Sequence, residues 1–208
     1  MTHTETAASE LAAVEIDGFT RSAFVLRSAL AVGAVYGTTM VSPFVGHALA
    51  QSGGGDVDIL NFALTLEYLE ADFYAQAGKL NLPSELMRIA SEFGQNESDH
   101  VEALTGTITD LGGTPAAMPA FTFPLKNKAS FLKLAQTLED TGVSAYNGAG
   151  PQIQSKDVLA AAGSIVQIEA RHAAAIRLQN KAEPAPEAFD MTLEMEEVLT
   201  AVQPFIKS

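Results

Sequence analysis

The feature that most constrains the fold of this chain is an internal repeat with a constant offset of 72 residues. The segment FALTLE at 62–67 corresponds to LAQTLE at 134–139, and AG at 77–78 corresponds to AG at 149–150. The offset continues through the next periodic segment of each half, where Gln95 corresponds to Gln167. A register that is unbroken over two segments and their loop indicates a duplicated supersecondary unit.

The hydrophobic pattern predicts that the repeated unit is a helical hairpin. Apolar side chains recur every three to four residues, as on one face of a helix, in four segments. These segments are 56–78, 83–112, 129–149 and a fourth from about residue 157. Pro83 is favourable in the first turn of a helix, and Gly150-Pro151 ends the third segment. The sequence therefore predicts an all-α fold with four main helices.

A short amphipathic helix is expected within the C-terminal extension, residues 181–208. It would span about 191–203, with Met191, Met195, Val198 and Val202 on one face. This face would cover the parent bundle or contact a partner chain, and packing on the parent bundle is the more ordinary use. A homo-oligomer formed through the bundle or this helix is thus one expected assembly.

The N-terminal segment is typical of an export signal. Residues 28–42 carry no charge and follow Arg21 and Arg27, and Ala48 and Ala50 form a small-x-small cleavage pattern. We expect a signal at 1–50, cleavage after Ala50, a linker at 51–55 and a periplasmic or other extracytoplasmic location. TRSAFVLR resembles a twin-arginine signal, although Ser22 stands at the place of the second arginine. An N-terminal helix that packs on the domain or stays as an anchor is the alternative.

Composition limits the chemistry that this chain can perform. The formal net charge of −13 argues against a nucleic-acid partner, because phosphate backbones repel acidic surfaces. The absence of cysteine excludes thiolate zinc sites and iron–sulfur clusters. A transition metal would therefore have to be held by histidine and carboxylate ligands. After residue 50 the only histidines are His100 and His172.

Both of these histidines end a Glu-x-x-His motif, ESDH at 97–100 and EARH at 169–172. Glutamate and histidine three residues apart share one face of a helix. Each half also carries a glutamate and a tyrosine seven residues apart on an apolar helical stripe, Glu67 with Tyr74 and Glu139 with Tyr146. Converging buried carboxylates repel one another unless a cation neutralises them. Two divalent ions would balance four carboxylates and be completed by two imidazoles.

The order Glu, Glu-x-x-His, Glu, Glu-x-x-His from about 56 to 180 resembles the ferritin-like superfamily, in particular the ferritin-like domain of desiccation-related proteins. This resemblance implies a four-helix bundle with one long crossover, which 113–128 is long enough to form. It implies a dinuclear iron or manganese centre with Glu97 and Glu169 as bridging carboxylates. The implied metal ligands are Glu67, Glu97, His100, Glu139, Glu169 and His172.

Tyr74 and Tyr146 match positions where related proteins keep tyrosine beside the metals. As catalytic residues they would orient ligands or supply an electron, and the alternative is that they are core aromatics with satisfied hydroxyls. Glu70 lies one turn beyond Glu67 and has no counterpart, because residue 142 is glycine. It is either an extra ligand, a residue on the access route to the metals, or part of neither.

The leading functional hypothesis is a reaction with dioxygen or hydrogen peroxide at the two metals. The activity would be that of a ferroxidase, a peroxidase or a catalase-like enzyme in oxidative or desiccation stress. The alternative is a non-enzymatic protein that protects against stress or sequesters metal, in which the ions are mainly structural. The sequence leaves open whether the protein is an enzyme.

Overall fold

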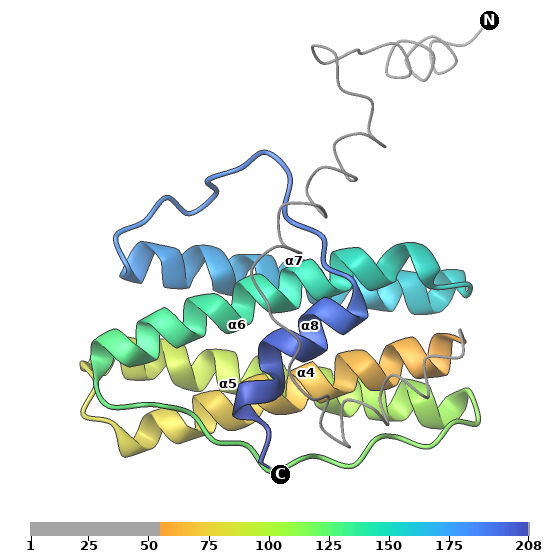
Figure 1. Cartoon of the computed structure of the whole chain (residues 1–208), viewed down its shortest axis with the longest axis horizontal. Helices are drawn as coiled ribbons and strands as arrows, with labels where there is room; N and C mark the ends of the chain where they lie inside the picture. The colour runs from red at the N-terminus through yellow and green to blue at the C-terminus, as the bar shows by residue number, and fades with distance from the viewer. Residues whose placement is uncertain (1–54, 208) are drawn as a thin grey trace, which may run out of the picture. The chain divides into compact units, whose positions relative to one another are not determined.

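The structure, a computed structural model, describes residues 55–207. The predicted signal at 1–50, its cleavage site and most of the predicted linker lie outside this range. Within it the chain is helical, and the label α4 marks the first described helix (Figure 1). The helices are α4 (Asp56–Gln76), α5 (Ser84–Asp110), α6 (Lys128–Ala149), α7 (Lys156–Gln179) and α8 (Met195–Val202), with 3-10 turns η1 (Ala77–Lys79), η2 (Gly150–Gln152) and η3 (Gln203–Phe205).

The four long helices form two hairpins, α4 with α5 and α6 with α7, which pack together as a bundle (Figure 1). The connection between α5 and α6, residues 111–127, runs along the bundle from one end to the other. This arrangement confirms the predicted all-α bundle with one long crossover.

Local polar contacts fix where the helices of the second hairpin begin. Asn127 and Ser130 form a reciprocal capping box at the start of α6. The Ser155 side chain accepts a hydrogen bond from the Val158 amide at the start of α7. The Asp56 carboxylate accepts hydrogen bonds from the Gln154 and Ser155 amides at 2.7 and 2.8 Å. The first residue of α4 is thereby joined to the loop of the other hairpin.

The apolar core extends on both sides of the middle of the bundle. On one side, the rings of Phe73 and Phe131 stack with centroids 5.1 Å apart, and both side chains have no solvent exposure. On the other side, Leu64, Ile108 and Tyr146 belong to a second buried cluster. Burying a large apolar side chain contributes about 1.5–3 kcal/mol, so these clusters hold the helices at fixed distances from one another.

The C-terminal extension packs on the bundle. Val198, Leu199 and Val202 of α8 are at most 2% exposed and belong to the core cluster that contains Phe73. Just before α8, the Leu193 amide donates to the Ser144 carbonyl of α6 at 3.1 Å. The packing face predicted for this helix therefore covers the parent bundle.

The start of α8 differs from the prediction of a helix from residue 191. A capping box between Glu194 and Glu197 begins the helix at Met195. Met191 consequently lies in the preceding segment and is 52% exposed. After α8 the chain pairs with the crossover, where the Lys207 amide donates to the Ala120 carbonyl at 2.8 Å.

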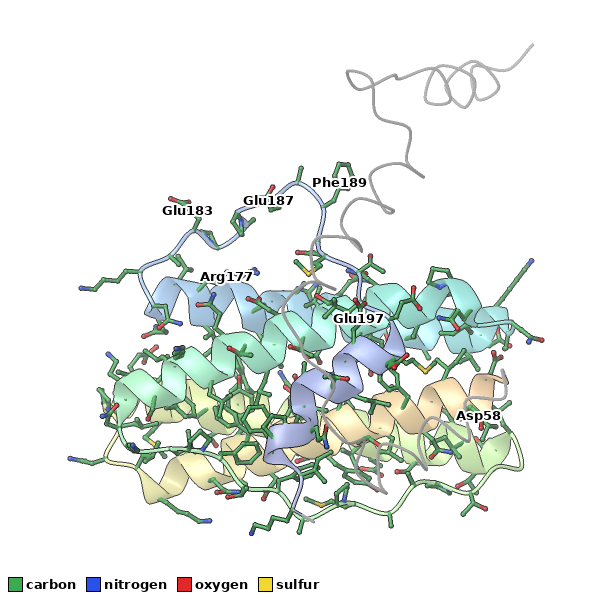
Figure 2. The ribbon with its side chains drawn as sticks, viewed as in Figure 1. Asp58, Arg177, Glu183, Glu187, Phe189 and Glu197 are labelled. Carbon is green, nitrogen blue, oxygen red and sulfur yellow. The ribbon has the colours of Figure 1, made fainter. Side chains whose placement is uncertain are left out.

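Charged side chains, among them Arg177, Glu183, Glu187 and Glu197, lie on the outer side of the described chain (Figure 2). Arg177 of α7 forms an ion pair with Asp140 of α6 at 2.7 Å. Glu183, Glu187 and Phe189 lie on the segment between α7 and α8, away from the helices (Figure 2). None of the described helices is both long enough and apolar enough to cross a membrane.

Candidate metal centre

The six residues that the sequence singled out as ligands lie together in the interior of the bundle. Each of the four helices contributes at its middle, with one glutamate on α4 and on α6, and a Glu-x-x-His pair on α5 and on α7. All four glutamates are completely buried. Their potential ligand atoms form two overlapping groups, and within each group these atoms lie within 4.8 Å of one another.

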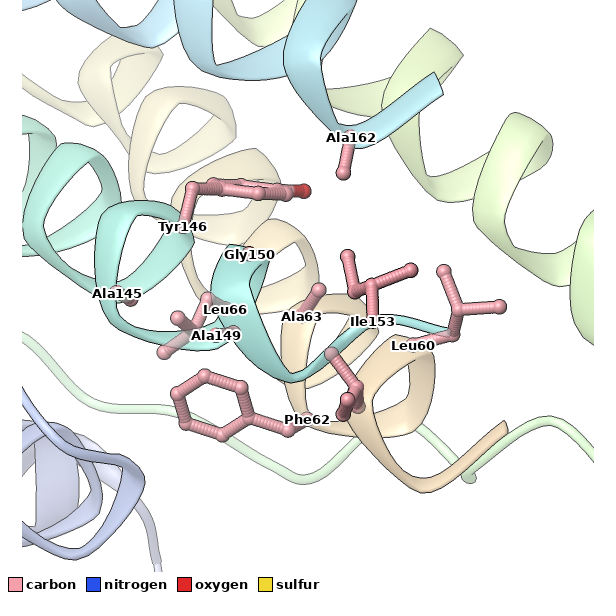
Figure 3. A pocket seen from close by; sticks show the side chains of 11 residues that line it. Leu60, Phe62, Ala63, Leu66, Ala145, Tyr146, Ala149, Gly150, Ile153 and Ala162 are labelled. Carbon is pink, nitrogen blue, oxygen red and sulfur yellow. The ribbon is translucent and has the colours of Figure 1, made fainter. Parts of the chain in front are cut away.

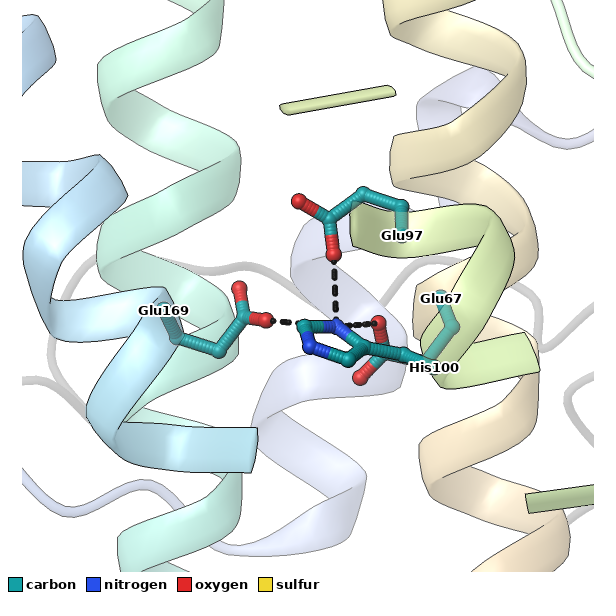
Figure 4. Close-up of side chains that lie close together, drawn as sticks. All are labelled: Glu67, Glu97, His100 and Glu169. Carbon is teal, nitrogen blue, oxygen red and sulfur yellow. Dashed lines mark hydrogen bonds and ion pairs between the residues drawn. The ribbon is translucent and has the colours of Figure 1, made fainter. Parts of the chain in front are cut away.

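The first group surrounds His100 (Figure 4). Its Nδ1 lies 3.1 Å from Glu67 Oε2, 2.9 Å from Glu97 Oε2 and 3.2 Å from Glu169 Oε1. Three helices thus direct carboxylates to one ring nitrogen. We call Glu67, Glu97, His100 and Glu169 the His100 group.

The second group surrounds His172 and consists of Glu97, Glu139, Glu169 and His172. We call it the His172 group. Here His172 Nδ1 lies 2.9 Å from Glu97 Oε1 and 3.5 Å from Glu139 Oε2. Glu97 and Glu169 belong to both groups, which is the position that a bridging carboxylate requires.

The two tyrosines contact this cluster through hydrogen bonds that cross between the hairpins. Tyr74 donates to Glu139, and Tyr146 donates to Glu67 Oε1 at 2.5 Å. Sequence spacing grouped Tyr74 with Glu67 and Tyr146 with Glu139, but two turns of one helix separate those partners too far for a hydrogen bond. The exchanged pairing depends on how the hairpins meet, and no local sequence signal carries it.

An apolar pocket lies beside Tyr146 (Figure 3). Its lining is aliphatic and aromatic, and includes Ala63, Ala145, Ala149 and Ala162. The pocket offers no charged group to a ligand. It gives Tyr146 an apolar surrounding on one side of the ring, while the hydroxyl faces Glu67.

Without bound metal, the cluster holds protons. Burial raises the pKa of Glu67 to about 7, and burial together with neighbouring carboxylates raises that of Glu169 well above its ordinary value. Burial also opposes a charge on His100, but the carboxylates of Glu169, Glu67 and Glu97 outweigh it and raise the pKa of His100 to about 12. A metal ion would displace these protons, because a ligating imidazole must be neutral and a ligating carboxylate ionised.

Glu97 behaves differently from the other carboxylates. Burial alone would raise its pKa, but the two histidine rings, each with Nδ1 2.9 Å from one of its oxygens, lower that pKa to about 2. Glu97 is therefore ionised at neutral pH and forms a close contact with both imidazoles. A carboxylate that contacts both ring systems is well placed to contact two ions.

Unpartnered polar atoms test whether a metal pair fits. Five buried atoms of the ligand set form no hydrogen bond of suitable geometry, and they are Glu97 Oε1, Glu139 Oε2, Glu169 Oε1, Glu169 Oε2 and His172 Nδ1. Apart from Glu169 Oε2, each has only an ion-pair contact of 2.9 to 3.5 Å between a carboxylate and an imidazole nitrogen. Such atoms are rare in proteins because each loses its hydration on burial. Cations among them would supply the missing partner. Oxygen and imidazole donors without sulfur suit iron or manganese.

Glu70 lies beside the cluster and outside both groups. It is 2% exposed, and burial followed by the charge of Glu169 raises its pKa well above the ordinary value. A Cβ atom at Gly142 would lie 3.1 Å from Glu70 Oε1 and 3.4 Å from Glu169 Oε2. Residue 142 is equivalent to Glu70 in the repeat. Because it is glycine, it leaves room for the carboxylate of Glu70.

Sequence reasoning missed two neighbours of His172. Asn96 Nδ2 lies 3.0 Å from His172 Nε2, on the side of the ring opposite the carboxylates. The Phe93 ring stacks on the imidazole with centroids 3.8 Å apart. Both precede Glu97 on α5, one residue and one turn away, but a polar and an aromatic residue beside a motif are too common to be recognised without the packing.

Comparison with known proteins agrees with the fold. A family model described as a ferritin-like domain matches residues 55–182. The chain therefore belongs to the ferritin-like family, as its sequence predicted. It is also similar to a solved structure, that of a conserved hypothetical protein, rv2844, from Mycobacterium tuberculosis. The TM-score is 0.56 at 19% identity, over 69% of this chain and 98% of that chain. At this identity the likeness supports the fold alone, and no curated protein matches the sequence.

Proposed function

We propose that this protein holds two iron or manganese ions and reacts with dioxygen or hydrogen peroxide, as a ferroxidase, a peroxidase or a catalase-like enzyme. The observation that carries the proposal is the pair of overlapping ligand groups that share Glu97 and Glu169. One site of four ligands would explain a structural metal. Two sites with common carboxylates suit ions that change oxidation state together.

The chain's own residues have separate tasks in this proposal. Two bound ions would supply a joint two-electron redox change. Glu97 and Glu169 would bridge the ions, Glu67 and Glu139 would each hold one ion, and each histidine would fix one ion with a neutral imidazole. The four carboxylates carry a charge of −4, which equals in size the charge of two divalent ions.

The tyrosines would orient the terminal carboxylates. In the contacts described each hydroxyl donates a hydrogen bond, that of Tyr74 to Glu139 and that of Tyr146 to Glu67. A donated hydrogen bond occupies one carboxylate oxygen and leaves the other directed to the metal. Burial and the adjacent carboxylate raise the pKa of Tyr74 and of Tyr146 well above the ordinary value, so both hydroxyls keep their protons.

Metal analysis followed by single-turnover and multiple-turnover kinetics tests the proposal. The full chain is purified from its native compartment, its iron and manganese are measured, and the reduced protein is mixed with dioxygen or peroxide. Repeated turnover is the expected result. A single stoichiometric oxidation, or none, would support the alternative of a metal-sequestering or stress-protective protein.

A pair of variants ties this result to the cluster. Glu139→Ala should lower both the metal content and the thermal stability of the metal-loaded protein, because it removes a ligand of the His172 group. Glu102→Ala, at an exposed position of α5, is the matched control and should change neither. If Glu139→Ala retains two ions and full thermal stability, the dinuclear proposal is wrong.

We further propose an extracytoplasmic location in which the protein acts in oxidative or desiccation stress. This proposal is based on the sequence of residues 1–50, with cleavage after Ala50. Determination of the N-terminal residue of the protein purified from the periplasmic and cytoplasmic fractions tests it directly. A mature chain that begins at Gln51 in the periplasmic fraction is expected, and an intact Met1 in the cytoplasm alone would contradict it.

A further inference from the structure

The two histidines are equivalent in the 72-residue repeat, but their surroundings are not equivalent. On the carboxylate side both rings present Nδ1 to glutamate oxygens. The differences lie on the opposite side of each ring. They concern the hydrogen bond to Nε2, the ring stack and the exposure to water.

His172 is held on every side. Asn96 lies 3.0 Å from its Nε2, Phe93 stacks on its face at 3.8 Å, and only 3% of its side chain is exposed. When Nδ1 binds a metal, Nε2 carries the proton and needs an acceptor. In the structure Asn96 Nδ2, a donor, faces Nε2, and a half-turn of the amide presents its oxygen as that acceptor. A hydrogen bond there fixes both the tautomer and the orientation of the ring.

His100 has neither neighbour. The register places Ile168 at the position that corresponds to Asn96, and Ile165 at that of Phe93. Isoleucine can accept no proton and forms no ring stack. The His100 side chain is also 11% exposed, so water can reach this imidazole. The duplication has therefore diverged at the residues that support the ligands, while the ligands themselves are the same.

We propose that Asn96 is a positioning residue for His172 and makes the two metal positions unequal, so that the ion in the His172 group is released more slowly than the ion in the His100 group. The inference rests on the two-metal centre of the proposed function. An ion leaves when its ligands turn away from it. His172 can turn only by breaking the Asn96 hydrogen bond and the Phe93 stack, whereas His100 can exchange its contacts with water.

Metal release from the full chain tests this inference. The protein is loaded with two manganese ions, freed of excess metal and mixed with an excess of chelator. The wild type should release manganese in a fast and a slow phase of equal amplitude, one ion in each. Loss of an outer hydrogen bond to a metal ligand typically weakens metal binding by about 10- to 100-fold. Asn96→Ala should accelerate the slow phase by about that factor and leave the fast phase unchanged.

Two further variants separate positioning from general loosening of the fold. Asn96→Asp keeps an oxygen acceptor for the Nε2 proton and should release the second ion as slowly as the wild type does. Gln95→Ala, at the exposed neighbouring position, should change neither phase. Circular dichroism of every variant verifies that the helices are retained.

The possible outcomes distinguish this inference from the function on which it rests. Equal release rates for two ions in the wild type, or a slow phase that Asn96→Ala leaves unchanged, would overturn the inference alone. Equal acceleration of both phases, or failure of Asn96→Asp to rescue, would also overturn it. Binding of fewer than two ions by the wild type would remove the dinuclear centre itself.

Discussion

Replacement of Glu67 by glutamine should stabilise the metal-free protein and weaken its response to metal. Glu67 is completely buried, and burial raises its pKa from 4.5 to about 7. At pH 8 the folded chain must hold it as a carboxylate, and this pKa difference corresponds to about 3 kcal/mol of lost stability. Glutamine has the same shape, carries no charge and can still accept a hydrogen bond from Tyr146.

The expected temperature changes are large enough to measure. In domains of this size a change of 1 kcal/mol shifts the melting temperature by about 2–4 °C. Metal-free Glu67→Gln should therefore melt about 6–12 °C higher than the metal-free wild type at pH 8. Each bound ion stabilises a protein by about 2.7 kcal/mol when the free metal is at 100 times its dissociation constant. The variant lacks one ligand of the His100 group and should lose most of the stabilisation from that ion.

Thermal unfolding at pH 8, with chelator and with manganese, measures both effects. Glu85→Gln is the control, since Glu85 is exposed and surface changes usually stay within about 0.5 kcal/mol. The variant should melt above the wild type in chelator, and this difference of about 3 kcal/mol should nearly disappear in manganese, because the variant lacks the stabilisation of about 2.7 kcal/mol from one ion. This prediction is wrong if Glu67→Gln melts lower than the wild type in chelator, or if manganese raises the melting temperature of both proteins equally. In either case Glu67 is not a buried carboxylate whose charge is neutralised by a bound metal ion.

Further predictions concern pH, a carboxylate beside the ligand groups and the packing of the C-terminal extension. Because the folded pKa of Glu67 is raised, its contribution to metal-free stability is complete below pH 4.5 and is lost as pH rises through about 7. The melting temperature in chelator should therefore fall between pH 4.5 and about 7, and the affinity for manganese should rise over the same range. Glu70→Gln should raise the metal-free melting temperature at pH 8 and leave two manganese ions bound by metal analysis, whereas loss of one ion would identify Glu70 as a ligand. Gly148→Ala should lower the melting temperature, because its Cβ would lie 1.9 Å from the Leu193 carbonyl oxygen. Gly106→Ala meets no atom within 4 Å and should stabilise α5 by about 0.5–1 kcal/mol, so equal effects of the two alanines in thermal unfolding would contradict this packing.

The sequence alone identified the six residues of the cluster because duplication made a weak pattern specific. A single Glu-x-x-His is common on helices, but ESDH and EARH occur at the same position of two repeats. Helical periodicity then placed each of these residues on an apolar face, where a charge demands a partner. The fold class followed from the same periodicity, since neither depends on distant contacts.

The tertiary structure decided how the two halves differ and which side chains meet between them. Tyr74 and Tyr146 donate to the glutamate of the opposite hairpin, and Asn96 of α5 reaches His172 of α7. Periodicity reports which face of a helix is buried but contains no information on which neighbour that face meets. Contacts between hairpins depend on the packing of many side chains over long sequence separations, so the asymmetry of the metal centre became visible only in the folded chain.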